Sequence, residues 1–296
     1  MFILPAFAAI GASFGWACGI ILAQSPARAI GAFEFTRIQL IACGAILSFL
    51  CAIFGYWQSV EWDYWQAFAF SIGLGIILGN LAMIECLRLG GPRRTELLLS
   101  FKAPLVALMA YLWMGETLSN TDLFGAAIAL SGITLAILFG GGRRHVNDPV
   151  DGSIIIVVGL GLFAAACQGA GFLLIKPAMQ AGTEPLAASA VRIVGASLLI
   201  SLVGLWPAKS LRSKVEVTPY LLFRTIIPGF IGYGISSSLL LYAFAHFNAG
   251  IAAVLGSLSP VIVLPLIWFK NGTPPHAIAW LGASLSILGT AIMVLS

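Results

Sequence analysis

A lysine in the middle of a long apolar stretch is the most unusual chemical feature of this chain. Lys102 lies about eight residues into the apolar stretch 94–113, two residues before Pro104. A lysine at the centre of a membrane helix costs about 2.5–3.5 kcal/mol on insertion scales, so its charge must be compensated. Three environments remain open: a buried carboxylate or carbonyl partner, an anionic ligand such as a carboxylate or phosphate, and a position rotated toward lipid.

Charged residues cluster where the apolar stretch 66–87 ends and the stretch 94–113 begins. Glu85 and Arg88 are three residues apart, as are Arg93 and Glu96, and this spacing suits ion pairs on a helix. Two interpretations of Glu96 follow. It belongs to a structural network at the membrane interface, or it is a protonatable gate that couples proton movement to a transported solute, because a positioned carboxylate can take up and release a proton.

Polar and aromatic side chains inside other apolar stretches extend the candidate site. The residues expected to face a substrate together with Lys102 are Trp16, Asn80, Gln168, Tyr233, Ser237 and Tyr242. Amides and hydroxyls in such stretches also bridge helices, so each polar group has a packing role as its alternative. Two further cations are interpreted as structural: Lys176 extends to the membrane interface, and Arg192 matches Arg37 as an anchor.

Catalytic and metal-binding patterns are missing from the sequence. His145, His246 and His276 have no HExxH or other close metal spacing, and neither a GxSxG elbow nor a Walker loop occurs. The five cysteines lie inside apolar stretches without CxxC spacing, which fits small packing residues. We therefore expect no enzyme activity, no metal and no cofactor. Energy for transport would come from an ion gradient, from exchange or from the substrate's own gradient.

The elements that position these residues are ten apolar stretches. Hydrophobic residues make up 60% of the chain and charged residues 9%, whereas a soluble domain carries about 25% charged residues. A helix needs about 20 apolar residues to cross the bilayer, and a backbone in lipid must satisfy its own hydrogen bonds. The sequence therefore predicts an all-α membrane protein with transmembrane helices near 4–22, 32–55, 66–87, 94–113, 122–140, 153–174, 185–206, 222–245, 249–269 and 276–295.

The last five stretches repeat the first five. Matching residues recur 155 to 157 positions apart: Arg37 and Arg192, Pro104 and Pro260, Gly125 and Gly282, Gly132 and Gly289. Each half has an odd number of crossings, so the second half enters the membrane inverted. The prediction is two inverted five-helix repeats, residues 1–145 and 146–296. Such repeats are typical of secondary transporters, whose site lies at the interface between the repeats.

The basic residues predict the orientation in the membrane. Twelve of the fifteen Lys and Arg residues fall in the odd-numbered connections, two fall in the even-numbered ones, and Lys102 lies within a helix. The positive-inside rule then places the odd-numbered connections in the cytoplasm and both termini on the non-cytoplasmic face. We expect a multi-pass protein of the inner (plasma) membrane in contact with lipid, and nothing in the charge favours nucleic acid.

These features resemble the EamA-type drug/metabolite transporters over essentially the full chain. The resemblance rests on the paired five-helix halves, the region of Trp16, the arginines and prolines repeated above, and Met114-Gly115-Glu116-Thr117-Leu118 with Gly125 downstream. It implies ten helices, a central cavity between the halves and movement of small metabolites such as amino acids, often outward. Two features depart from the family: Glu116 has no acidic counterpart in the second half, and bacterial exporters usually have cytoplasmic termini.

We therefore expect a secondary transporter that moves a small metabolite, an amino acid or another small organic anion or zwitterion, by alternating access around a central cavity. Lys102 would bind the anionic end of the substrate, and Glu96 would couple transport to protons. A non-catalytic membrane interaction protein or receptor is the alternative, and a membrane-embedded enzyme is a third class. The substrate, the direction of transport and the oligomeric state are not determined by the sequence.

Overall fold

The computed structural model describes residues 3–139, 153–205, 215–271 and 274–295, and every regular element in these ranges is a helix. Nine of the described helical segments are long and apolar enough to cross a membrane, and Asn120–Ala136 is a shorter apolar helix. The prediction of an all-α membrane protein with ten transmembrane helices is therefore confirmed. The expected boundary between residues 145 and 146 lies outside the described residues.

The first half consists of six α-helices and three short segments of other helical type. In chain order they are α1 (Ile3–Ile30), α2 (Ala32–Phe54), η1 (Tyr56–Ser59), η2 (Trp62–Tyr64), α3 (Trp65–Phe70), η3 (Ser71–Leu78), α4 (Gly79–Ser100), α5 (Lys102–Met114) and α6 (Asn120–Phe139). The second half is α7 (Ile154–Leu174), α8 (Lys176–Gln180), α9 (Pro185–Gly204), α10 (Pro219–Gly229), η5 (Phe230–Ser236), α11 (Ser237–His246), α12 (Ala249–Leu255), α13 (Ser259–Asn271) and α14 (Ala277–Leu295).

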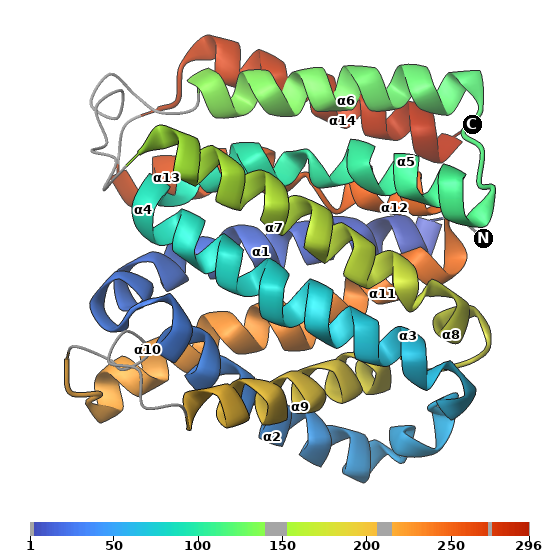
Figure 1. The fold of residues 1–296 in the computed structure, drawn as a ribbon. Coiled ribbons are helices and arrows are strands. Elements are labelled where there is room, and N and C mark those ends of the chain that lie inside the picture. Colours follow the sequence, from blue (N-terminus) through green and yellow to red (C-terminus); the bar gives the residue numbers. More distant parts are fainter. Residues whose placement is uncertain (1–2, 140–152, 206–214, 272–273, 296) are drawn as a thin grey trace.

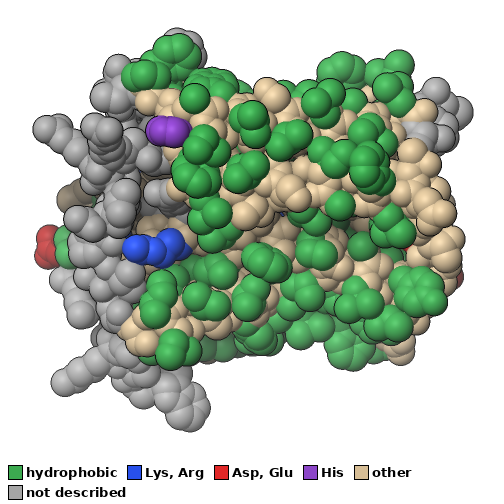
Figure 2. All heavy atoms as spheres, turned by 90° about the horizontal axis from the view of Figure 1, so that it is seen from above, with side chains coloured by type: hydrophobic (Ala, Val, Ile, Leu, Met, Phe, Trp, Pro, Cys, Tyr) green, Lys and Arg blue, Asp and Glu red, His purple; other side chains and the backbone are tan. Residues whose placement is uncertain are grey.

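The helices lie alongside one another in a bundle, and both chain ends are at the same end of it (Figure 1). An even number of crossings requires this arrangement. We call the end that carries Ile3, Leu295, Gly115 and α8 the terminal end, and the end with the turn at Gly31 the opposite end. Hydrophobic side chains cover most of the described surface in the view of Figure 2, as a lipid-facing surface requires.

Helices α6 and α14 form the fifth membrane crossings of the two halves. They pack against each other through the glycines that repeat in the sequence. A Cβ atom on Gly132 would lie 2.5 Å from the carbonyl oxygen of Gly282, and a Cβ atom on Gly125 would lie 2.8 Å from that of Gly289. Small residues let membrane helices approach this closely. The repeated glycines therefore join the two halves to each other as well as marking equivalent positions in them.

The fourth and ninth membrane crossings are broken in the middle of the bundle. α4 ends at Ser100 and α5 begins at Lys102, while α12 ends at Leu255 and α13 begins at Ser259. Pro104 and Pro260 lie in the first turns of α5 and α13, where a missing backbone N–H leaves no hydrogen bond unmade. Lys102 is therefore the first residue of α5, and only the turn residue Phe101, with helical φ of −65° and ψ of −11°, separates α4 from α5. The span expected over 94–113 agrees with the apolar segment Arg94–Met114.

The third and eighth crossings each contain a π-helical segment, η3 and η5. A π-helical turn is wider than an α-helical turn and occurs frequently at functional sites. The apolar pattern predicted ordinary helices at both places, because hydropathy does not separate the two helix types. These two segments and the two helix breaks bring irregular backbone from both halves to the middle of the bundle.

Candidate functional site

A cavity of about 120 Å³ lies among these irregular segments, and both halves of the chain line it. Its walls come from α1, α2, η3, α4 and α5 in the first half, and from α7, α9, α10, η5, α11 and the break after α12 in the second. Cavities for drug-sized ligands measure about 300–1,000 Å³. This cavity therefore fits a smaller molecule.

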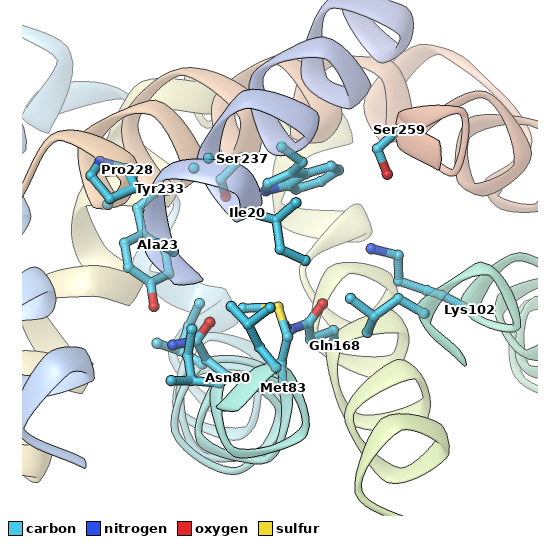
Figure 3. Close-up of a pocket in the computed structure, with 18 of the residues that line it drawn as sticks. Ile20, Ala23, Asn80, Met83, Lys102, Gln168, Pro228, Tyr233, Ser237 and Ser259 are labelled. Carbon is cyan, nitrogen blue, oxygen red and sulfur yellow. Dashed lines mark hydrogen bonds between the residues drawn. The ribbon is translucent and has the colours of Figure 1, made fainter. Parts of the chain in front are cut away.

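The structure brings most of the predicted site residues together around this cavity. Its lining includes Trp16, Asn80, Glu96, Lys102, Gln168, Tyr233 and Ser237. In Figure 3 the amine of Lys102 points into the space between Ser259 and Gln168, and the hydroxyl of Tyr233 points toward Asn80. Tyr242 does not belong to the lining. Its ring packs against that of His246, with the centroids 4.3 Å apart.

Lys102 is buried and faces aromatic rings instead of a carboxylate. Its Nζ atom lies 4.7 Å from the ring centroid of Trp16 and 5.9 Å from that of Phe172, and the residue is 7% exposed. Glu96 interacts with it electrostatically, but the two do not form one of the ion pairs found among the described residues. Of the three environments considered, a cavity-facing cation fits, and the lipid-facing position does not.

Glu96 connects the two halves of the chain at the cavity wall. Its Oε2 atom accepts a hydrogen bond of 2.6 Å from the hydroxyl of Ser259, the first residue of α13. The side chain of Arg93, its expected partner, lies outside the described residues. The second expected pair is present: Arg88 Nη2 lies 2.5 Å from Glu85 Oε1. Glu96 is thus a buried carboxylate at the junction of a first-half helix and a second-half half-helix.

Arg192 differs from its sequence counterpart Arg37, so the interpretation of the pair as equivalent anchors is wrong. Arg37 forms an ion pair with Glu34, three residues earlier, and its side chain is 36% exposed. Arg192 has Ser189 at that position, lines the cavity and is 1% exposed. Its Nε and Nη1 atoms make no hydrogen bond in the described structure. The sequence signal for this difference was the absence of a carboxylate three residues before Arg192.

Phe172 is a site residue that the sequence did not reveal. The guanidinium carbon of Arg192 lies 4.7 Å from its ring centroid, and Lys102 approaches the same ring. Trp16 meets Phe172 edge-on, with the centroids 6.1 Å apart. An aromatic face attracts cations electrostatically. The ring therefore stabilises two charges that form no ion pair among the described residues. Only the fold brings α5, α7 and α9 together.

A polar network joins the two halves at the terminal end of the bundle. Lys176 forms an ion pair with Glu116 and donates a 2.9 Å hydrogen bond to the carbonyl oxygen of Phe247. Oε2 of Glu116 accepts a 2.8 Å hydrogen bond from the backbone N–H of Ala249. We call Glu116, Lys176, Phe247 and Ala249 the terminal lock. Lys176 is buried, so the expectation that it extends to the membrane interface is corrected: a specific carboxylate compensates its charge.

The lock also explains the asymmetry of the two repeats. Glu116 follows α5 in the first half, and its two partners, Lys176 and Ala249, are in the second half. An acidic counterpart of Glu116 in the second half is therefore not needed for pairing. At the opposite end, the cavity lining extends to Ala23, Phe35 and Leu87, near the turn at Gly31.

Comparisons with known proteins identify the family and the fold. The sequence matches the EamA-like transporter family over residues 3–138 and 155–295. It is 26% identical over 208 residues to a probable terminal-alkyne amino-acid exporter of Streptantibioticus cattleyicolor, a match that spans 68% of this chain and 64% of that relative. A solved crystal structure has the same fold, with a TM-score of 0.74, 17% identity, and coverage of 98% of this chain and 97% of that one.

Proposed function

Because the chain belongs to the EamA-like transporter family, we propose that it is a secondary transporter that moves a small amino acid or another small organic anion or zwitterion. Family membership supports a membrane transporter of small molecules over an enzyme. A cavity between two inverted repeats, with discontinuous helices at its wall, supports transport by alternating access. The amino-acid exporter among its relatives supports the substrate class.

The observation that carries this proposal is the buried Lys102 at the cavity wall. Its amine has aromatic neighbours and no ion-pair partner within the described structure. An anionic group of the substrate would compensate this charge on binding. Trp16 offers an aromatic face to the substrate, and Asn80, Gln168, Tyr233 and Ser237 offer donors and acceptors that would orient it.

Glu96 is the residue we propose for coupling to protons. It is a buried carboxylate in the wall of the substrate cavity, and its bond to Ser259 joins the two halves. Protonation of Glu96 would remove the negative charge of the carboxylate that accepts the hydrogen bond from Ser259. The contact between α4 and α13 would thereby change. The gain and loss of this proton would favour different arrangements of the two halves.

The terminal lock supports a specific step of the transport cycle. In the described arrangement it connects the end of α5 with α8 and with the start of α12. Opening the cavity toward the terminal end requires these contacts to separate, while Lys102 and Glu96 stay in the cavity wall. We propose that the lock forms in the state that is closed at the terminal end and breaks in the opposite state.

We further propose that the protein is a plasma membrane protein with both termini on the non-cytoplasmic face. The bias of twelve basic residues to two supports this orientation, and it directs the opposite end of the cavity to the cytoplasm. A C-terminal reporter that is active only in the cytoplasm should remain silent. A bright cytoplasmic signal would reverse the orientation.

The experiment that tests transport uses the purified full-length protein in proteoliposomes and a panel of labelled amino acids and small organic acids. We expect uptake or exchange of at least one carboxylate by the wild type. The Lys102→Met variant should lose about ten- to 150-fold in rate, because hydrogen bonds to charged groups contribute about 1.5–3 kcal/mol. Lys102→Arg keeps the charge, and Arg224→Met removes an exposed cation as the matched control. Equal transport by Lys102→Met and the wild type would remove Lys102 from the site.

A further inference from the structure

The charges that line the cavity are unbalanced. Its ionisable lining residues, apart from Tyr233, are two cations, Lys102 and Arg192, and one carboxylate, Glu96. Glu96 already accepts a hydrogen bond from Ser259. Neither cation belongs to an ion pair among the described residues, and Nε and Nη1 of Arg192 make no hydrogen bond there. The cavity therefore holds more buried positive charge than the protein compensates, and buried charges are normally paired.

The two cations occupy separate positions around one aromatic ring. Arg192 approaches Phe172 from α9 with its guanidinium carbon 4.7 Å from the ring centroid, and Lys102 approaches from the start of α5 at 5.9 Å. Lys102 also lies over the ring of Trp16, at 4.7 Å from its centroid. A ligand with two acidic groups would place one beside Arg192 and the other beside Lys102.

Glycines in the backbone around the cavity leave space for the guanidinium of Arg192. A Cβ atom on Gly75 of η3 would lie 3.3 Å from Nη2 of Arg192 and 2.9 Å from the Cα atom of Gly171. The close approach of η3 to α7 at these two glycines leaves room for the arginine without giving it a hydrogen-bond partner. A planar guanidinium with free N–H groups matches a carboxylate in a two-point contact.

The half-helices add to the positive potential of the site. α5 and α13 are each 13 residues long, and both begin at residues that line the cavity, Lys102 and Ser259. The N-terminus of a helix carries a partial positive charge, and half-helix N-termini face anionic groups in membrane transporters. Three features of different origin, namely two side chains and a pair of helix ends, thus favour negative charge here.

We propose that the substrate carries two acidic groups, one bound by Arg192 and the other by Lys102, so that the protein selects small dicarboxylate-type metabolites. This inference rests on the proposed transport function and narrows its substrate class. A substrate with one carboxylate leaves one cation buried without a counter-charge. An amino group on a two-carboxylate substrate would have Glu96 as its partner. Arg192 is thereby a binding residue.

The test compares pairs of solutes that differ by one carboxylate, with the full-length protein in proteoliposomes and in detergent. The probes are L-aspartate against L-alanine and succinate against butyrate. We expect at least a tenfold preference for the diacid of one pair or both, in transport rate and in the concentration that raises the melting temperature. A site with a dedicated partner for a polar group strongly disfavours an analogue that lacks the group.

Variants at the two positions distinguish the contributions of Lys102 and Arg192 to binding. Lys102→Met should reduce the preference for the diacid over its one-carboxylate analogue to less than threefold, while transport of the one-carboxylate probe persists. Lys102→Arg should retain the preference for the diacid. Arg192→Lys should weaken binding of both members of a pair. The melting temperatures of the wild type with each probe test the preference even where a variant does not fold.

The outcomes distinguish this inference from the proposed function. Transport of alanine or butyrate at the same rate as the corresponding diacid would overturn the two-acid inference and leave transport standing. An equal loss of both members of a pair in Lys102→Met would also overturn it, because one carboxylate would then bridge both cations. Absence of transport and of binding for all probes and for the wider panel would contradict the proposed function itself.

Discussion

The two buried lysines of this protein, Lys176 and Lys102, have opposite surroundings. Lys176 meets a carboxylate and a backbone carbonyl at the terminal lock. Lys102 meets two aromatic rings at the cavity wall and belongs to none of the described ion pairs. Burial alone therefore does not indicate the role of a charge in a membrane. A charge in an ion pair within the protein holds helices together, whereas a buried charge that faces rings and forms no ion pair is available to a ligand.

The largest expected change in stability comes from breaking the terminal lock. Lys176→Met leaves Glu116 without its counter-charge. Removal of one partner from a fully buried pair costs about 3–5 kcal/mol, and we expect about 2–3 kcal/mol here because the Glu116 side chain keeps 19% exposure. Thermal unfolding in detergent measures the change.

A double-mutant cycle isolates the interaction between the two charges. The double variant Lys176→Met/Glu116→Gln removes both charges and keeps an oxygen acceptor for the N–H of Ala249. It should be less destabilised than the two single variants predict together. Additive effects would show that the pair does not hold the terminal end closed, and the contrast with Lys102 would lose its basis.

A smaller loss of stability is expected where the two halves meet outside the cavity. In Gly132→Ala the new methyl group would meet the carbonyl oxygen of Gly282 at 2.5 Å, so α6 and α14 must move apart. Overpacking of this kind costs about 1–3 kcal/mol. Gly159→Ala on α7 is the matched control, because no heavy atom lies within 4 Å of its added Cβ.

The same glycine variant sharpens the contrast between packing and binding. Gly132→Ala should lower the melting temperature without changing the order in which solutes are preferred. A change in that order would mean that the contact between α6 and α14 determines the shape of the cavity. Substrate selection would then not be confined to the lining residues.

The smallest expected effect is that of Glu96→Gln. Under the coupling proposal, an imposed pH gradient stimulates transport by the wild type about tenfold, which corresponds to about 1.4 kcal/mol of activation free energy. The Glu96→Gln variant loses this stimulation. Glutamine keeps an oxygen that accepts from Ser259, so transport without a gradient should persist. Equal stimulation of wild type and variant would leave Glu96 as a structural link between the halves.

The sequence predicted those parts of the structure that depend on local composition. Length and apolarity were enough for the ten helices, because the bilayer imposes both. The three-residue spacing of Glu85 and Arg88 predicted their ion pair. Lys102 was identified as a cavity cation because a charge in an apolar stretch needs compensation.

Features that depend on contacts between distant segments were not predicted. Lys176 and Glu116 are 60 positions apart, and neither residue indicates the other in the sequence. Pro104 is compatible with a continuous helix and with the first turn of a new one, so the turn at Phe101 between α4 and α5 was not predicted. Arg192 was grouped with Arg37 by repeat position, although only Arg37 has a glutamate three residues before it.

Binding measured for both lysines in one experiment tests the contrast between them most directly. The probe is the panel carboxylate that the wild type transports fastest, and its equilibrium affinity is measured in detergent for the variants Lys102→Met and Lys176→Met/Glu116→Gln. We predict at least a tenfold loss of affinity for Lys102→Met and a change of less than threefold for the lock variant. Equal affinities for Lys102→Met and the wild type would contradict a substrate site at Lys102.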